Sequence, residues 1–158
     1  MHNKRVYDIN IAIERIKNYC TLQDRCQWDV LQKLREWGLQ QATKDYILEI
    51  LITDKFIDEE RFSISFCRGK FRIKNWGKRK IVNELKRKQI SSICINTGLK
   101  EIDEKEYNLV LVKLFYQKES SIKDKNQFIR RTKIANFLIQ RGFENNLVWD
   151  KIRELSDK

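Results

Sequence analysis

A dense run of basic side chains between Arg68 and Lys88 is the part of this sequence best suited to binding a polyanion. The run holds ten lysines or arginines and one acid, Glu84, so it carries a net charge of +9 out of the chain's +11. Apolar residues recur among these charges, which gives the segment a face on which to fold and distinguishes it from a disordered basic tail. The pattern predicts a folded, positively charged surface for nucleic-acid phosphates.

The predicted phosphate contacts lie in two parts of the chain. In a helix expected to begin near Lys78, the apolar Ile81, Val82 and Leu85 fall within an arc of about 100°, and basic residues occupy the opposite side. A smaller basic group lies nearer the C-terminus. The full set of predicted nucleic-acid contacts is Arg68, Lys70, Arg72, Lys74, Lys78, Arg79, Lys80, Lys86, Arg87, Lys88, Arg130, Arg131, Lys133 and Arg141. A merely solvated helix face is the alternative interpretation.

The sequence contains few side chains that could catalyse a reaction or hold a metal. The single histidine is His2, and neither Gly69-Lys70 nor Gly77-Lys78 has the remaining residues of a phosphate-binding P-loop. The four cysteines form no CxxC pair; they are Cys20, Cys26, Cys67 and Cys94. We therefore expect a protein that is not an enzyme, with no catalytic residue, no metal site, no cofactor, and reduced thiols that are mostly buried.

The residues that precede the basic helix predict a second helix and a turn. Asp58 is expected to cap a helix over residues 58–73, which carries Phe62, Phe66, Gly69 and Ile73 along one stripe. The sequence Asn75-Trp76-Gly77 then breaks it. The indole of Trp76 has two interpretations, stacking on an unpaired base or anchoring the turn to the core, and core packing is the stronger.

Three segments share one pattern of helix, turn and helix. Ile81 lies 51 residues after Val30, and Ile134 lies 53 residues after Ile81; each is followed four residues later by a leucine. The turn positions that come next are Gly38, Gln89 and Gly142. A further helix is expected before each segment, over residues 9–20, 58–73 and 103–118. With no proline and only five glycines, the pattern predicts an all-α fold of tandem three-helix repeats in an elongated, curved chain, with domains at 1–53, 54–102 and 103–158.

These segments resemble the RecX family, the bacterial regulators of the RecA recombinase. Residues 55–91 resemble the family's acidic-Arg-Phe helix, glycine turn and Arg-rich helix, and residues 130–155 resemble its C-terminal repeat with an Arg-Gly-Phe turn. Weaker similarity covers residues 19–52. Gln89 stands where the family usually has glycine, and Lys78 where it often has proline. The resemblance implies no catalysis and binding to RecA filaments on single-stranded DNA, with modulation, usually inhibition, of recombinase activity.

Two other functions remain open, and the compartment follows from composition. A helix-turn-helix DNA-binding protein without RecA specificity would place residues 78–88 in the major groove, although lysines there outnumber side chains that read bases. A nuclease would need more carboxylates around Glu84 and Lys86 than the sequence supplies. No apolar run reaches the roughly 18 residues of a membrane span, and the N-terminus lacks a signal peptide. We expect a cytoplasmic monomer without membrane partners that binds single-stranded and also double-stranded DNA.

Overall fold

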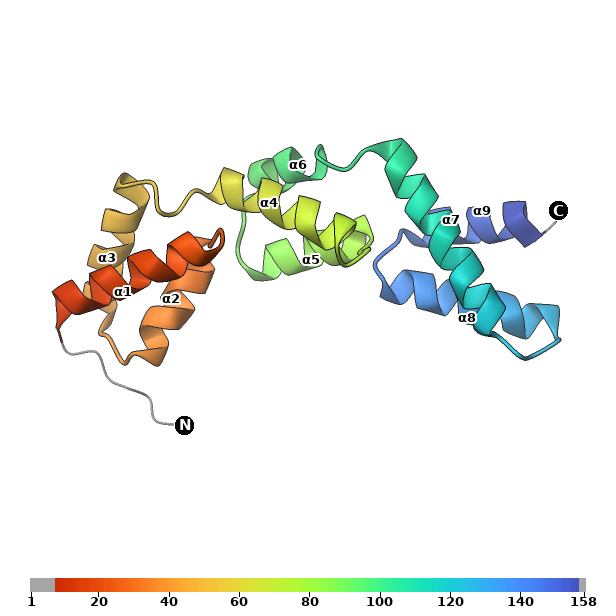
Figure 1. Ribbon diagram of the computed structural model, residues 1–158, viewed down its shortest axis with the longest axis horizontal. Helices are drawn as coiled ribbons and strands as arrows, with labels where there is room; N and C mark the ends of the chain where they lie inside the picture. Colours follow the sequence, from red (N-terminus) through yellow and green to blue (C-terminus); the bar gives the residue numbers. More distant parts are fainter. Residues whose placement is uncertain (1–7, 157–158) are drawn as a thin grey trace.

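The protein is a chain of short helices arranged along one long axis (Figure 1). The computed structural model describes residues 8–156, and in that range it contains helices and no strand, which confirms the all-α prediction. The helices are α1 (Ile9–Leu22), α2 (Gln27–Glu36), α3 (Gln41–Thr53), α4 (Glu59–Arg72), α5 (Lys78–Arg87), α6 (Ser92–Leu99), α7 (Glu104–Ser121), α8 (Gln127–Gln140) and α9 (Asn145–Ser156). They form three groups of three, α1–α3, α4–α6 and α7–α9.

Local signals in the sequence determine where α4 begins and ends. The Asp58 side chain accepts a hydrogen bond from the Arg61 amide at 2.9 Å, as expected of an N-cap. The helix ends at Arg72, and Asn75 in the turn that follows has a left-handed φ of 55°. The predicted stripe along α4 is partly wrong, because Phe62 is buried but the Ile73 side chain at the end of the helix is 79% exposed.

The turns after α2, α5 and α8 have the same conformation. Gly38, Gln89 and Gly142 all have left-handed backbones, with φ of 74°, 62° and 99°. In each turn the next amide donates to the carbonyl of the repeated leucine, at 3.4 Å for Leu39 to Leu34, 3.0 Å for Ile90 to Leu85 and 3.2 Å for Phe143 to Leu138. This geometry satisfies carbonyls left free at a helix C-terminus. The sequence equivalence of the three turns is confirmed.

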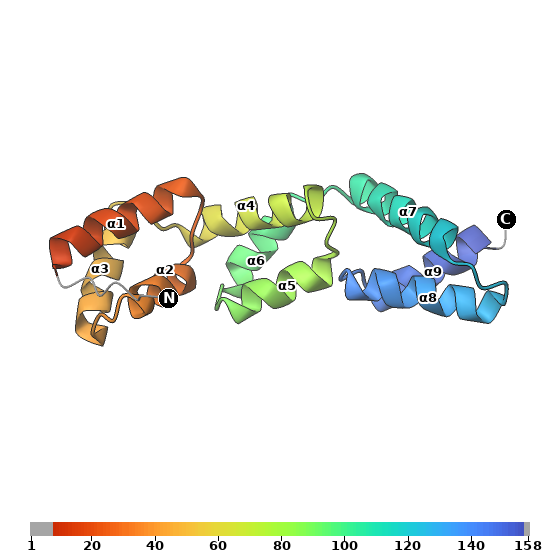
Figure 2. The same ribbon diagram turned by 60° about the horizontal axis from the view of Figure 1, so that its bottom comes forward.

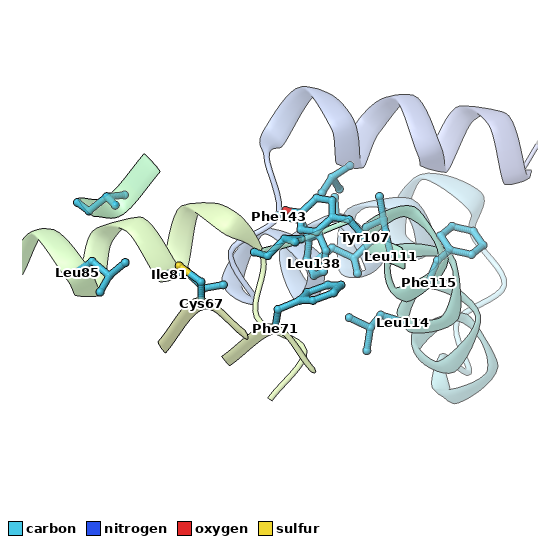
Figure 3. Close-up of a cluster of buried hydrophobic side chains, with 14 of the residues drawn as sticks. Cys67, Phe71, Ile81, Leu85, Tyr107, Leu111, Leu114, Phe115, Leu138 and Phe143 are labelled. Atoms are coloured by element: carbon cyan, nitrogen blue, oxygen red, sulfur yellow. The ribbon is translucent and has the colours of Figure 1, made fainter. Parts of the chain in front are cut away.

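The buried apolar side chains form two clusters. The first lies within α1–α3 and the connection that follows, and it consists of Ala12, Ile16, Cys20, Val30, Leu34, Ile47, Leu51 and Ile57. The second runs without interruption through the middle and last groups, where Tyr107 packs at 5.7 Å from Phe71 and 5.1 Å from Phe143, measured between ring centroids (Figure 3). Cys26, at the start of α2, belongs to this second cluster. All four cysteines are free and all but Cys94 are buried, as predicted.

The second helices of the three groups, α2, α5 and α8, follow one another end to end (Figure 2). At the contact that we call the α5–α8 seam, the Gly77 amide donates to the Arg141 carbonyl at 2.7 Å, and the Arg79 amide donates to the Gly142 carbonyl at 2.9 Å. A Cβ on Gly77 would overlap the Gly142 backbone, and one on Gly142 would lie 2.6 Å from the Lys80 nitrogen. The seam therefore requires glycine on both sides.

The contact between α2 and α5 is made by side chains instead. Lys88, at the end of α5, forms an ion pair with Asp29 in the first turn of α2, and both side chains are largely covered, at 14% and 10% exposed. A separate bond joins α2 to α4, because the Gln27 amide donates to the Glu59 carboxylate at 3.4 Å. The two contacts occupy equivalent places in the repeat, but one is built from backbone and the other from charged side chains.

Candidate nucleic-acid interface

The apolar face of α5 fixes the direction in which its basic face points. Ile81 and Leu85 are fully buried and Val82 is half-buried against the second cluster. Arg79 and Lys86, seven residues apart, are exposed on the other side of the helix, as the periodicity predicts. The basic face is therefore held by the core and is not a mobile tail.

Cations fill the first turn of α5, where the helix dipole disfavours them. Lys78, Arg79 and Lys80 are the first three residues of the helix, and the turn contains no acid. A cation at this position costs about 0.3–1 kcal/mol, the amount that an anion there would gain. The carbonyls of Arg141 and Gly142 offset part of this cost, because they accept hydrogen bonds from the amides at the seam.

A buried tyrosine engages a further amide of this turn. The Lys78 amide donates to the Tyr107 hydroxyl at 2.9 Å, and that hydroxyl donates to Glu144 at 2.5 Å. Burial, together with the hydrogen bond to Glu144, raises the pKa of Tyr107, so the phenol stays neutral and keeps donating. The Lys78 ammonium meanwhile pairs with Glu104. The amides of Gly77, Lys78 and Arg79 at the start of α5 are thus used within the fold.

Four of the predicted contacts are paired with acids inside the protein. The pairs are Arg68 with Glu101, Lys78 with Glu104, Arg87 with Glu84, and Lys88 with Asp29. The first three are open to solvent on at least one side, where such pairs contribute little to stability and exchange readily. Lys88 is different, because its ammonium is largely covered and holds α5 against α2.

Two predicted arginines hold turns in place. Arg130 donates to backbone carbonyls at the end of α7, among them Ile122 at 2.8 Å. Arg141 donates to the Lys74 carbonyl at 3.0 Å and so ties the turn after α8 to the end of α4. Arg131 is half-buried on α8. The charge of this C-terminal group therefore serves the architecture to a larger extent than the sequence indicates.

Five of the predicted cations are exposed and have no acidic partner or hydrogen-bond acceptor for the side chain within residues 8–156. They are Arg72, Lys74, Arg79, Lys86 and Lys133. All but Lys133 come from α4, α5 and the turn between them. An external phosphate can bind these four without breaking an internal contact.

The last two predicted cations lie over aromatic rings. The ammonium of Lys70 is 4.8 Å from the centroid of the Trp76 ring, and that of Lys80 is 4.4 Å from it. Trp76 packs edge-on against Phe66, with centroids 6.3 Å apart, and is half-buried against the second cluster. Trp76 therefore packs on the core, as predicted, but it is only half-buried and remains partly accessible.

A groove of about 430 Å³ lies between α5 and the end of α8. It is lined by Arg79, Lys80, Asn83, Glu84, Arg87, Ile139, Gln140 and Gly142. Arg87 donates to Glu84 and lowers the pKa of that carboxyl, so the only acid in the groove remains ionised and is neutralised by its neighbour. Arg79 and Lys80 then leave the groove positively charged. Sequence analysis missed Asn83 and Gln140, because uncharged amides carry no signal in a charge pattern.

A metal site and a membrane-spanning helix are both absent from the portion of the chain that the structure describes. Across residues 8–156, no three histidine, cysteine or acidic side chains come together as a metal site would require. No helix in this range is long and apolar enough to cross a membrane.

The sequence is similar to those of known proteins. Residues 58–99 match the family described as RecX, second three-helix domain. A regulatory protein RecX from Prosthecochloris aestuarii is 27% identical over 150 residues, which cover 94% of this chain and 95% of that protein. One from Bacillus cytotoxicus is 23% identical over 142 residues, and there the chain spans only 52% of the relative's length.

Solved structures show the same fold. The crystal structure of RecX from Lactobacillus salivarius superposes with a TM-score of 0.79 at 21% identity and covers 95% of this chain and 97% of that one. A second crystal structure, of a regulatory protein RecX, gives a TM-score of 0.81 at 22% identity and covers 92% of this chain and 71% of that one. The resemblance noted in the sequence is confirmed.

Proposed function

The chain is a member of the RecX family, and from this premise we propose that it binds RecA filaments assembled on single-stranded DNA and inhibits their recombinase activity. The elongated arrangement of the three helix groups, α1–α3, α4–α6 and α7–α9, supports the proposal, because an extended chain offers length along a filament. In this proposal the middle group contacts DNA phosphates and the full length contacts successive recombinase subunits.

The observation that carries the DNA contact is the set of unpaired cations on α4, α5 and their connecting turn. Arg72, Lys74, Arg79 and Lys86 are exposed and unpaired within the described residues. Each phosphate contact on single-stranded DNA lowers the slope of log K against log salt by about 0.7, so four contacts give a slope near −3. Phosphate contacts carry no direct sequence information, so we expect little sequence preference.

The phosphate contacts are tested by removing these four charges together. We expect the variant Arg72→Gln, Lys74→Gln, Arg79→Gln, Lys86→Gln to stay helical by circular dichroism, to bind single-stranded DNA more weakly, and to lose most of the salt slope. A matched control removes four exposed cations of the last group, Lys105, Lys113, Lys123 and Lys125, which changes the net charge equally. Equal weakening by both variants would assign the binding to net charge and not to this surface.

Recombinase specificity is tested by co-sedimentation. The protein is mixed with RecA filaments on single-stranded DNA, and bare DNA of the same length serves as the control. We expect more protein to sediment with filaments than with bare DNA, and strand exchange to be inhibited at concentrations that leave bare DNA largely unbound. Equal sedimentation in both arms would refute the proposal and favour a plain DNA-binding protein that inhibits by competition.

A further inference from the structure

A second cavity, of about 380 Å³, lies where α4 and α5 meet the connection between α1 and α2. Its volume falls within the range of about 300–1,000 Å³ typical of small-molecule sites. Glu84 lines both this cavity and the groove between α5 and α8. The parts of its wall that matter here are Phe66, Gly69, Ile73 and Trp76, with Lys70 and Lys74 beside them.

Gly69 has no reason in packing to be glycine. It lies in the interior of α4, where glycine is about 1 kcal/mol less favourable than alanine. A Cβ built on Gly69 meets nothing within 4 Å, whereas a Cβ on Gly77, Gly98 or Gly142 would overlap neighbouring atoms. Because no packing need explains Gly69, its missing side chain serves mainly to keep this wall of the cavity flat and open.

The wall around Gly69 is apolar and only partly covered. Phe66 and Trp76 are half-buried and lie edge to face, and the Ile73 side chain is 79% exposed. Aromatic and aliphatic surface that lines a cavity and is not needed to close the core is typical of a binding site.

The acidic side chains around the cavity are all paired, but some of the basic ones are not. Its three acids, Asp24, Asp29 and Glu84, are each paired with a cation, namely Arg61, Lys88 and Arg87. Three lining cations have no acidic partner within residues 8–156. Arg25 donates to the Tyr19 carbonyl at 3.3 Å, which leaves Lys70 and Lys74. The cavity therefore offers an aromatic wall together with two available positive charges.

We propose that this cavity binds one unstacked base of single-stranded DNA, with the adjoining phosphate on Lys70 and Lys74. The base stacks on one of the two rings, Phe66 or Trp76, which are inclined at 73° to each other, and lies over Gly69. Every nucleotide carries the anion that the two lysines require. The Lys70 ammonium now lies over the Trp76 and Phe66 rings, at 4.8 and 5.4 Å from their centroids, and it moves from the rings to the phosphate when the base enters. The inference rests on the proposed DNA contact and adds a base-dependent part to it.

The test compares an oligothymidylate with an abasic strand of the same length, because both carry the same phosphates. Fluorescence anisotropy should show the parent protein binding the oligothymidylate about tenfold more tightly, as expected from one stacked base. Gly69→Leu fills the cavity from an open helix position, and we expect it to bind both strands equally, at the level of the abasic strand. Ala42→Leu adds nearly the same bulk at an exposed position of α3 and should behave like the parent.

Folding is checked separately, since Gly69→Leu should melt no lower than the parent. Equal affinity of the parent for both strands would overturn the base pocket and leave the phosphate contacts standing, whereas failure to bind either strand would refute both proposals. If the parent does not distinguish the strands and Gly69→Leu weakens co-sedimentation with recombinase filaments, the cavity holds a protein side chain and not a base. A Gly69→Leu protein that keeps the tenfold preference would also contradict the inference.

Discussion

Replacing Gly142 by alanine should break the α5–α8 seam. The residue has a φ of 99°, where an L-residue is strained by about 1–2 kcal/mol. The added Cβ would also overlap Lys80 Cβ and lie 2.6 Å from the Lys80 nitrogen, so the turn must move away from α5. That movement lengthens the two seam hydrogen bonds, each of which contributes about 0.5–1.5 kcal/mol. We therefore expect Gly142→Ala to lower the free energy of unfolding by about 2–5 kcal/mol.

Gly38→Ala is the matched control for this variant. Gly38 occupies the same position in the first group, with a φ of 74°, and it is exposed at the end of the row of helices. Its replacement adds backbone strain without a seam to break, so it should cost about 1 kcal/mol. Urea unfolding followed by far-ultraviolet circular dichroism measures both variants. Equal destabilisation by the two would show that the seam contributes nothing and would refute the reasoning.

Three further changes have expected outcomes. Gln89→Gly relieves a left-handed φ of 62° and should raise the free energy of unfolding in urea by up to about 1 kcal/mol; a decrease would contradict the equivalence of the turns. Asp29→Ala leaves Lys88 covered and unpaired and should cost about 2–4 kcal/mol, part of which Lys88→Met in the same protein should recover; no recovery would show that the pair is not the cause. Burial raises the pKa of Cys67 from 9.0 to about 11, so the thiolate is disfavoured only in the folded state and the free energy of unfolding falls as the pH rises from 9 towards 11. Between pH 8 and 10, the free energy of unfolding of Cys67→Ala should therefore fall by about 1 kcal/mol less than that of the parent. Identical losses in the two proteins would contradict this.

Features set by neighbouring residues could be predicted from the sequence. The cap at Asp58, the break at Asn75 and the turn at Gly142 depend on side-chain acceptors and on backbone conformations that few residues adopt. Gln89 was placed correctly in the turn series from the repeat alone, although it is not a glycine. The apolar arc of α5 likewise follows from periodicity, because Ile81 and Leu85 are fully buried.

Features that depend on how the groups stack could not be predicted. The partner of Lys88 is Asp29, 59 residues earlier in the chain, and no periodicity links the two. Arg141 was grouped with phosphate contacts because it is basic, yet its guanidinium is held by the Lys74 carbonyl. Charge content therefore locates a basic surface, while the fold decides which of its cations are free to act.

Gly69 shows the same limit for the candidate sites. In the sequence it is one small member of an apolar stripe, and glycine in a helix usually permits close packing. In the structure the space in front of it is empty. The sequence shows that residue 69 is small, but it does not show whether other atoms fill the space beside it.

The end-to-end row of α2, α5 and α8 gives the chain a polarity. The last turn of each helix sits on the first turn of the corresponding helix in the preceding group, so units join head to tail and in one direction only. A further three-helix unit could be added in the same way without changing the existing contacts, since its second helix would need only the first turn of α8 to pack against. The number of units is therefore a variable that evolution can change by duplication, independently of the core of each unit.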